Sequence, residues 1–579
     1  MHARPDVTTQ LTYFGPADTP LFGVVCTPRD GQVRGGVVMC PPLGKEQADS
    51  TRGMKLLAER LAAQGFLVLR FDYLCTGESA GAQDSPGAAD GWLASIASAV
   101  QFVRDAGTET VALVGLRVGA LLACQQVDRL GSLAALVLWD PVVNGRHHVR
   151  GQSALHNMSV GPVDPADERV HLVGASLHST TAAQLSRMRV TADVLADDQR
   201  LPVLCAIRDT DLELPVVKAL GQRGARVAPI GDPTRFIASE TVYFELPTHA
   251  VEVIARWVDA VLPKTVAPVT VRQQMRITVG AGAGGPDIDK SITVLPGGTV
   301  VWETAPADSS RGVDNLLMAY STANDIRTGP ARLWVEAGDL VAGLNGRTIR
   351  FDRPGVGESG NVDADDDFAP LYTPESVEQA RAVFDFAAER PSRIVHAGLC
   401  SGSWLAAHGG CWPEESHVVM VNPLMWRLRA RTFDTAMAIA SGAASQPVDS
   451  PGAGAPWSTR AQARLRGTLG PSLRKHMPYP LVGLLGAAGV VQAPQLLLRE
   501  LAGRGLRPDV LFSPWDHERF TVNRGPKAVS KLKPDRRPQV TVTPTGDHPG
   551  LHWAVRAAVI DRCLSALAEP GGDRAAVQR

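Results

Sequence analysis

The sequence of 579 residues predicts an α/β fold made of two tandem domains, each a mostly parallel sheet flanked by helices. One pattern of helix, strand and loop occurs twice in the chain, and apolar strand segments alternate with helical segments. Such alternation indicates βαβ units and a parallel sheet. The apolar segments lack period-two alternation, which is typical of strands covered on both faces. Single domains extend to about 250 residues, so the chain accommodates two.

The repeat is clearest around an Arg-Phe-Asp triplet. Residues 54–79 read MKLLAERLAAQGFLVLRFDYLCTGES, and residues 333–359 read LWVEAGDLVAGLNGRTIRFDRPGVGES. Each copy predicts an amphipathic helix, an apolar strand, and Arg-Phe-Asp followed after four residues by Gly-Glu-Ser. Downstream, TVALVGLRVGALLA (110–123) and RIVHAGLCSGSWLAA (393–407) each predict a strand, a Gly-Leu-x-x-Gly turn and a helix. A repeat of this length indicates a duplicated domain rather than a solenoid unit.

The boundary between the two domains is predicted near residue 264, with a first domain at 1–264 and a second at 265–579. A predicted helix ends at Leu262, and Pro263 and Pro268 then disfavour helix. The following segment, MRITVGAGAGGPDIDKSITVLPGGTVVWETAP, is expected to form antiparallel hairpins that open the second domain.

A candidate nucleophile lies in the Gly-Leu-Cys-Ser-Gly segment at 398–402. The preceding strand must turn sharply into a helix there, and the flanking glycines are needed because side chains would collide in that turn. Cys400, the central residue, also lies at a helix N-terminus, where the dipole and free N–H groups favour a thiolate. We predict Cys400 as the nucleophile. The alternatives are a glycine-rich turn with a buried cysteine, or attack by Ser401, which is one residue out of phase with the glycines.

An acid and a histidine are expected to follow the nucleophile in chain order. The strand in RPDVLFSPWDHERF ends in a loop with Asp516 and His517, and the strand in PQVTVTPTGDHPGLHW ends in a loop with Asp547, His548 and His552. Loops after successive parallel strands lie side by side at the carboxyl edge of a sheet. We predict Asp516 as the orienting acid and His548 as the base. Asp547 is the alternative acid, and His517 and His552 are the alternative bases.

Two oxyanion donors are also expected. The N–H of Ser401, which follows the nucleophile, is the first. The second is expected in the turn after the strand NLLMAYS, where Thr322 and Ala323 are the candidates.

The segments RFD…GVGES, GLCSGSW, VVMVNPLMW and GDHPG together resemble the α/β-hydrolase superfamily. More narrowly, they are similar to exosortase-associated hydrolases and to hydrolases of polysaccharide and natural-product clusters. The resemblance implies two tandem α/β-hydrolase domains and hydrolysis or transfer of an acyl group. It also implies a cap over the second site, at about 424–508. Arg427, Arg429 and Arg431 in this cap form either a solvated basic helix face or a site for an anionic group, such as a phosphopantetheine arm.

The first half resembles a branch of the same superfamily with Gly-Leu-Arg at the turn. Arg117 occupies the position of the nucleophile, and a protonated guanidinium cannot attack a carbonyl. Asp209 and Asp211 lie at the acid position, and His249 lies at the base position. We therefore predict a non-catalytic first domain, with Arg117 paired to Asp209 or Asp211 in a degenerate site.

Composition and net charge restrict the classes of binding partner and the expected location. A formal net charge of −1 and a pI of about 6.9 give no indication of a nucleic acid or an anionic membrane. The start MHARPDVTTQ does not read as a signal peptide, and no run approaches ~18 apolar residues, so a cytoplasmic location is expected. The eight cysteines are scattered without a CxxC pair, so no zinc site, disulfide framework, metal or cofactor is predicted.

We therefore expect an acyl-transfer enzyme, either an acyltransferase or a thioesterase or esterase, that acts through a covalent thioester on Cys400 in a biosynthetic pathway. The expected substrate is a small-molecule or carrier-bound acyl (thio)ester, with an acyl carrier protein as a candidate partner. The alternative is a non-catalytic scaffold or binding protein built of two hydrolase-like folds.

Overall fold

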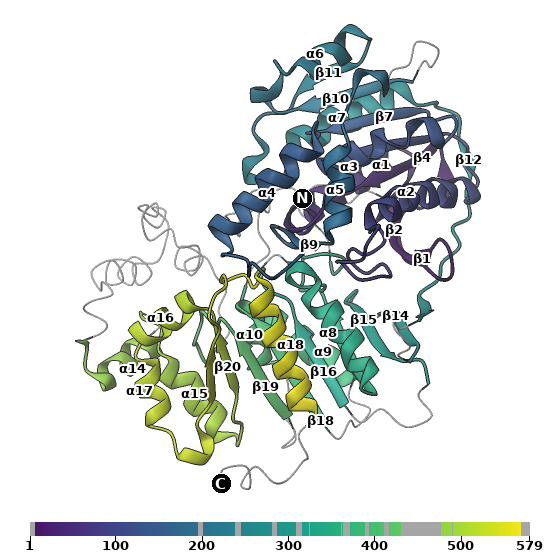
Figure 1. Ribbon diagram of the computed structural model, residues 1–579. Coiled ribbons are helices and arrows are strands. Elements are labelled where there is room, and N and C mark those ends of the chain that lie inside the picture. The colour runs from purple at the N-terminus through teal and green to yellow at the C-terminus, as the bar shows by residue number, and fades with distance from the viewer. Residues whose placement is uncertain are drawn as a thin grey trace, which may run out of the picture. The chain divides into compact units, whose positions relative to one another are not determined.

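The computed structural model divides the chain into two compact units (Figure 1). The first comprises Met1–Thr293 and Gly355–Phe368, and the second comprises Val294–Pro354 and Ala369–Arg579. The structure describes residues 6–194, 201–237, 245–280, 286–308, 315–323, 325–360, 362, 371–387, 393–409, 416–429, 476–488 and 490–568.

The first sheet has eight strands in the order β1-β2-β5-β4-β6-β7-β10-β11. Strand β2 pairs antiparallel with β1 and with β5, and every further pairing along the sheet is parallel. The strands are β1 (Val7–Phe14), β2 (Leu21–Pro28), β4 (Gly35–Cys40), β5 (Phe66–Phe71), β6 (Val111–Leu116), β7 (Ala135–Trp139), β10 (Val203–Ile207) and β11 (Arg226–Pro229).

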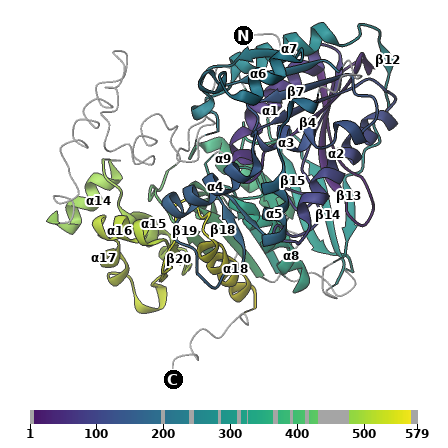
Figure 2. The same cartoon turned by 45° about the horizontal axis from the view of Figure 1, so that its top comes forward.

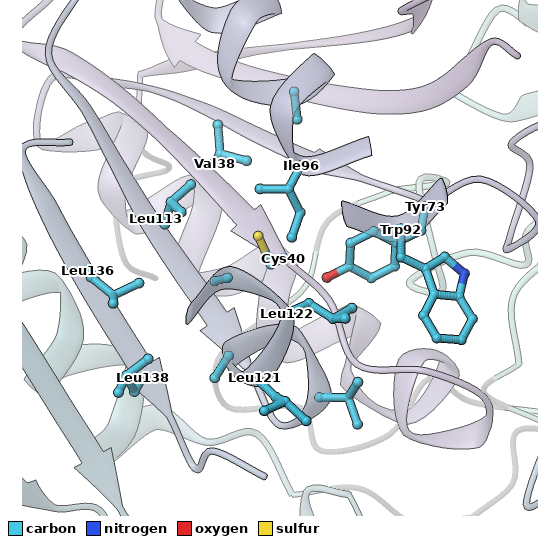
Figure 3. Close-up of a cluster of buried hydrophobic side chains, with 14 of the residues drawn as sticks. Val38, Cys40, Tyr73, Trp92, Ile96, Leu113, Leu121, Leu122, Leu136 and Leu138 are labelled. Carbon is cyan, nitrogen blue, oxygen red and sulfur yellow. The ribbon is translucent and has the colours of Figure 1, made fainter. Parts of the chain in front are cut away.

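Helices cover both faces of this sheet. Helices α1 and α7 pack on one face, and α2 and α3 pack on the other. Figure 3 shows one of the two resulting cores, in which Val38 and Leu113 from the strands meet Trp92 and Ile96 of α2 and Leu121 of α3. The helices are α1 (Lys45–Ala63), α2 (Ala88–Asp105), α3 (Val118–Cys124), α4 (Gly145–Ser159), α5 (Ser179–Arg187), α6 (Pro215–Gln222) and α7 (Thr248–Val261).

Short elements complete the first unit. Between β7 and β10 the chain forms α4, α5 and the antiparallel pair β8 (Val170–Leu172) and β9 (Ala175–Leu177). Strand β3 (Gln32–Val33) pairs antiparallel with β12 (Ala267–Pro268).

The second sheet has nine strands in the order β13-β14-β15-β17-β16-β18-β19-β20-β21. From β14 onward this order matches that of the first sheet strand for strand, and all pairings from β17 to β21 are parallel. The strands are β13 (Arg276–Val279), β14 (Ile288–Val294), β15 (Val300–Pro306), β16 (Asn315–Tyr320), β17 (Gly346–Phe351), β18 (Arg393–Leu399), β19 (Ser416–Val421), β20 (Asp509–Phe512) and β21 (Gln539–Val542).

Helices also flank the second sheet. Helices α8 and α18 pack together on the strands, as α1 and α7 do, while α9 packs against α10. Helices α14 to α17 gather beside β20 (Figures 1 and 2). The helices are α8 (Leu333–Gly343), α9 (Pro374–Ala387), α10 (Ser401–Ala406), α14 (Tyr479–Ala487), α15 (Pro494–Gly503), α16 (Pro514–Val522), α17 (Gly525–Ser530) and α18 (Trp553–Ala568).

The predicted fold class is confirmed, because both sheets are mostly parallel and flanked by helices. The pair β13 and β14 is antiparallel, as expected for the segment after residue 268. Of the predicted cap, residues 430–475 and with them Arg431 lie outside the described residues, whereas α14 and α15 belong to its described part.

The aspartates of the two Arg-Phe-Asp triplets fix the loops around them. Asp72 accepts hydrogen bonds from the side chain of Gln47 (2.7 Å) and the N–H of Glu78 (2.9 Å). Asp352 accepts hydrogen bonds from the N–H (2.7 Å) and the guanidinium (3.0 Å) of Arg327. In both triplets the carboxylate is buried or half-buried and bonded, so its role is structural.

The glycines around the two strand-to-helix turns leave no room for a side chain. A Cβ on Gly402 would lie 2.4 Å from the carbonyl oxygen of Tyr320, and a Cβ on Gly119 would lie 2.1 Å from that of Cys40. A Cβ on Gly398 would lie 2.1 Å from the carbonyl oxygen of Gly402. These contacts are with backbone, which cannot move without displacing a strand or a helix.

We therefore expect Gly402→Ala to destabilise the second unit by about 3 kcal/mol, the upper part of the range for overpacking. Urea unfolding followed by circular dichroism measures the loss. Gly343→Ala is the control, since a Cβ there meets nothing within 4 Å and alanine favours helix. Equal stability of the Gly402→Ala protein and the wild type would contradict the close packing of this turn.

Candidate active site

The residue between strand and helix has the same strained backbone in both units. Cys400, between β18 and α10, has φ 52° and ψ −111°, and Arg117, between β6 and α3, has φ 53° and ψ −118°. Positive φ is unfavourable for residues other than glycine and persists only where the surrounding structure imposes it. The N–H of Cys400 donates to the carbonyl of Val421 (2.8 Å), and that of Arg117 donates to the carbonyl of Trp139 (3.0 Å).

In the second unit, His548 joins Asp516 to Cys400. His548 lies in the loop between β21 and α18, and its Nδ1 lies 2.8 Å from Oδ1 of Asp516 in the first turn of α16. The other carboxylate oxygen of Asp516 accepts a hydrogen bond from the Ser513 hydroxyl (2.6 Å). The His548 side chain is within hydrogen-bonding reach of the Cys400 thiol. The three residues predicted as nucleophile, base and acid are thus brought together.

The charged forms of Cys400 and His548 stabilise each other. Burial raises the pKa of the Cys400 thiol, but His548 and Thr322 together outweigh burial, and the pKa falls below the usual value of a thiol. Burial lowers the pKa of His548, but Asp516 and Cys400 outweigh it and hold this pKa well above the usual range of a histidine. Opposite charges within a few ångströms favour the ionised forms of both groups. Both shifts act toward the same pair of charged forms, a thiolate on Cys400 and an imidazolium on His548.

The surroundings of the thiol include both predicted and unpredicted residues. The Thr322 side chain lowers the pKa of Cys400. Tyr372 is buried against Trp404, and its burial, together with the nearby Cys400, raises the pKa of its hydroxyl. The N–H of Ala323 donates to the Ser401 hydroxyl (2.8 Å). Ala323 can therefore serve an oxyanion only when that bond opens. Tyr372 was missed in the sequence because it lies in a loop without a motif.

The alternative acid and bases have other contacts. Asp547 accepts the N–H groups of Leu551 (3.2 Å) and His552 (2.8 Å), so it fixes the turn that leads into α18. His552 is buried beneath this turn. The His517 ring packs near Phe512, with 5.9 Å between ring centroids.

Trp515 and Arg519 border the trio on α16. The Trp515 ring lies edge-on to the His548 ring, with 5.9 Å between centroids, and 44% of the residue is exposed. The Arg519 guanidinium lies 4.6 Å from the centre of the Trp515 ring. Burial lowers the pKa of Arg519, against the opposing charges of Asp516 and Cys400. This arrangement gives one side of the site a cation next to an accessible aromatic ring.

The predicted pairing of Arg117 with Asp209 or Asp211 is wrong. The Arg117 guanidinium instead pairs with Glu46 (3.2 Å) in the first turn of α1 and with Asp140 (3.4 Å), which directly follows β7. Asp209 accepts the N–H of Gly231, and Asp211 lies 3.9 Å from the Arg208 guanidinium.

His249, the predicted counterpart of the base, is exposed in the first turn of α7. Arg208 also pairs with Asp140, at 2.5 and 2.9 Å. The corresponding place in the first unit therefore holds two cations and two carboxylates.

Removing Arg117 should destabilise the first unit. Arg117→Met leaves the carboxylate of Glu46, whose side chain is 11% exposed, without its cation, whereas Asp140 keeps Arg208. We expect a loss of about 2 kcal/mol in urea unfolding, below the full effect of breaking a buried pair because the site is partly solvated. The double variant Glu46→Gln/Arg117→Met should recover part of the loss, and Arg60→Met, which breaks an exposed pair, is the control. An unchanged midpoint for Arg117→Met would rule out a stabilising pair.

The ion pair also predicts unusual thiol reactivity. Because His548 holds the pKa of Cys400 low, alkylation by iodoacetamide should stay fast below pH 8, where an ordinary thiol slows about tenfold per pH unit. His548→Ala should restore the profile of an ordinary thiol. Four other thiols should label slowly because burial raises their pKa to about 12, namely Cys40, Cys124, Cys205 and Cys563. The same pH profile for wild type and His548→Ala would contradict the ion pair.

Across the described residues, no group of three His, Cys, Asp or Glu side chains is placed to hold a metal ion. No helix within those residues is long and apolar enough to cross a membrane.

Comparisons with known proteins give no family. No family model matches the chain, and no curated protein matches it. The chain is similar to a hypothetical protein from Pseudomonas aeruginosa, at 14% identity and TM-score 0.34 over 44% of this chain and 94% of that one. It is also similar to Est1E from Butyrivibrio proteoclasticus with bound ferulic acid (16%, 0.31, 43% and 96%). A third similar structure is brefeldin A esterase, a bacterial homologue of human hormone sensitive lipase (17%, 0.30, 44% and 76%).

Proposed function

We propose that the chain is an acyl-transfer enzyme of the α/β-hydrolase type that uses a Cys400–His548–Asp516 triad. One observation carries the proposal: the His548 ring bonds to the Asp516 carboxylate and faces a thiol of lowered pKa on a strained strand-to-helix turn. A nucleophile, a base within hydrogen-bonding reach and a group that orients the base are the arrangement that nucleophilic catalysis requires.

The reaction proceeds in two steps. The Cys400 thiolate attacks the acyl carbonyl, and the imidazolium of His548 gives its proton to the leaving group, which leaves a thioester on Cys400. Neutral His548 then takes a proton from the acceptor as the acceptor attacks the thioester, the bond between the acyl carbon and the Cys400 sulfur breaks, and the thiolate is restored. Asp516 holds the ring with Nδ1 toward itself and stabilises each imidazolium that forms.

The oxyanion is held near the start of α10. The N–H of Ser401 is the first donor, and the loop with Thr322 and Ala323 supplies the second. The Tyr372 hydroxyl is an additional candidate, because it lies near the sulfur that the acyl group will join. A donor that faces the sulfur is close to the carbonyl oxygen of a group bound to it.

Thioester chemistry favours acyl transfer or thioester hydrolysis over plain ester hydrolysis, since amines and thiols attack a thioester well. The substrate class we propose is a small-molecule or carrier-bound acyl thioester of a biosynthetic pathway, with an acyl carrier protein as a candidate carrier. The cation of Arg519 beside Trp515 supports a substrate with an anionic group, such as a phosphopantetheine arm. Residues 424–508 are proposed as the cap, and a cytoplasmic location stays a prediction.

We further propose that the chain arose by duplication, with a boundary near residue 264, and that the first domain is non-catalytic. The shared strand order and the closely similar backbone angles of Cys400 and Arg117 support the duplication. The ion pairs of Arg117 with Glu46 and Asp140 support a structural role for the former nucleophile position. A pure scaffold would need no lowered thiol pKa at Cys400, so the second unit favours an enzyme.

Substitution of the nucleophile tests the reaction type. Cys400→Ala should abolish turnover of an acyl thioester, with a fall in kcat of at least about 1000-fold. Cys400→Ser should keep a little activity and shift it toward hydrolysis, because an oxyester is less open to aminolysis. Free acid and conjugate are quantified with and without an amine acceptor.

The two outcomes separate the proposals. If the wild type gives only free acid across a broad panel of acceptors, the enzyme is a thioesterase or esterase rather than a transferase. If Cys400→Ala keeps full activity, the triad assignment is wrong.

A further inference from the structure

Asn422 connects the loop that holds His548 with the start of α16, the helix that holds Asp516. It follows β19, has φ 46°, and is fully buried. Its Nδ2 donates to the carbonyl oxygens of Asp547 (3.2 Å) and His548 (2.9 Å), and its Oδ1 accepts the N–H of Ser513 (2.7 Å). One side-chain amide thus binds the backbone of His548 and the backbone of Ser513, the residue that precedes the helix with Asp516.

The same residue lies next to the nucleophile. The N–H of Cys400 bonds to the carbonyl of Val421, and the N–H of Asn422 bonds to the carbonyl of Leu511 (2.9 Å). Asn422 therefore lies where the carboxyl ends of β18, β19 and β20 meet. A displacement of its side chain would reach all three members of the triad.

The chemistry of this position requires a neutral amide. Both N–H groups of Asn422 face carbonyl oxygens, and its oxygen faces an N–H. A carboxylate has no donor, so it would bring a negative charge against two carbonyl oxygens. It would also place that charge close to the Cys400 thiolate and so raise the pKa of the thiol.

The first unit has the opposite combination at the same place. Asp140 follows β7, has φ 43°, is 1% exposed, and bonds through its N–H to the carbonyl of Ala206 (2.7 Å). Its carboxylate pairs with Arg117 (3.4 Å) and Arg208 (2.5 Å). In the first unit the carboxylate of Asp140 therefore accompanies the cation of Arg117 at the turn. In the second unit the amide of Asn422 accompanies the thiol of Cys400.

We propose that Asn422 is a positioning residue of the triad. Its amide holds the His548 loop in place, and its neutrality allows the thiolate to form. The inference rests on the proposed function of Cys400.

Two variants separate the two effects. In Asn422→Asp, the pH midpoint of Cys400 alkylation by iodoacetamide should rise by about one unit, which means about tenfold slower alkylation at pH 6. In Asn422→Ala, which adds no charge, the midpoint should move less. For both variants, kcat for p-nitrophenyl acetate should fall about tenfold or more, with KM within about twofold, because the base is misplaced rather than the substrate released. Asp140→Asn, the matched change in the first unit, should alter neither readout.

The outcomes distinguish this inference from the proposed function. If both variants are folded by circular dichroism and keep the wild-type midpoint and kcat, the positioning role is overturned while the triad stands. If Asn422→Asp does not fold, the kcat of Asn422→Ala decides, and a wild-type value overturns the role. If Cys400 of the wild type has the alkylation midpoint of an ordinary thiol and the protein shows no turnover, the proposed function is wrong, and this inference is wrong as well.

Discussion

The site depends on one steric constraint, the close approach of a helix to the carboxyl end of a strand at the turn that holds Cys400. Glycines at 398 and 402 allow this approach, since a Cβ at either position would overlap backbone atoms. Cys400, the central one of the three residues between them, is left at positive φ. Cys400 is in this way presented to groups from three other loops, and Arg117 is presented by the same turn in the first unit.

The side chain at the turn determines which charged groups can surround it. A thiolate at Cys400 is compatible with an imidazolium, hydroxyl groups and the neutral amide of Asn422. A guanidinium at Arg117 is compatible with the carboxylates of Glu46 and Asp140. Burial makes each mismatch costly, because an unpaired charge in a partly buried site loses hydration without a partner. One backbone thus supports a thiol of lowered pKa in one unit and an ion-pair cluster in the other.

Features that depend on local pattern could be predicted from the sequence. The apolar segments, the glycines of the turn and the repeated triplet indicated two mostly parallel sheets, and the structure confirms this fold class. Chain order and strand ends also placed Asp516 and His548 correctly beside each other. Their catalytic roles remain predictions.

Features that depend on the reach of a side chain or the path of a loop could not be predicted. Arg117 was predicted to pair with Asp209 or Asp211, but its long side chain reaches Glu46 and Asp140 instead. Tyr372 comes to the thiol from a loop without a motif. For Asn422 a signal was present: comparison of VLWDP with VMVNP shows an amide in one repeat where the other has an acid.

The central claim is that Cys400 forms a covalent acyl intermediate with the help of His548. Mass spectrometry of peptides from protein incubated with a short-chain acyl thioester tests this claim most directly. The account predicts one acyl group on the peptide with Cys400 in the wild type, none on that residue in Cys400→Ala, and much less in His548→Ala. Acylation at Ser401 or at another residue, or equal acylation of Cys400 in the His548→Ala protein, would contradict it.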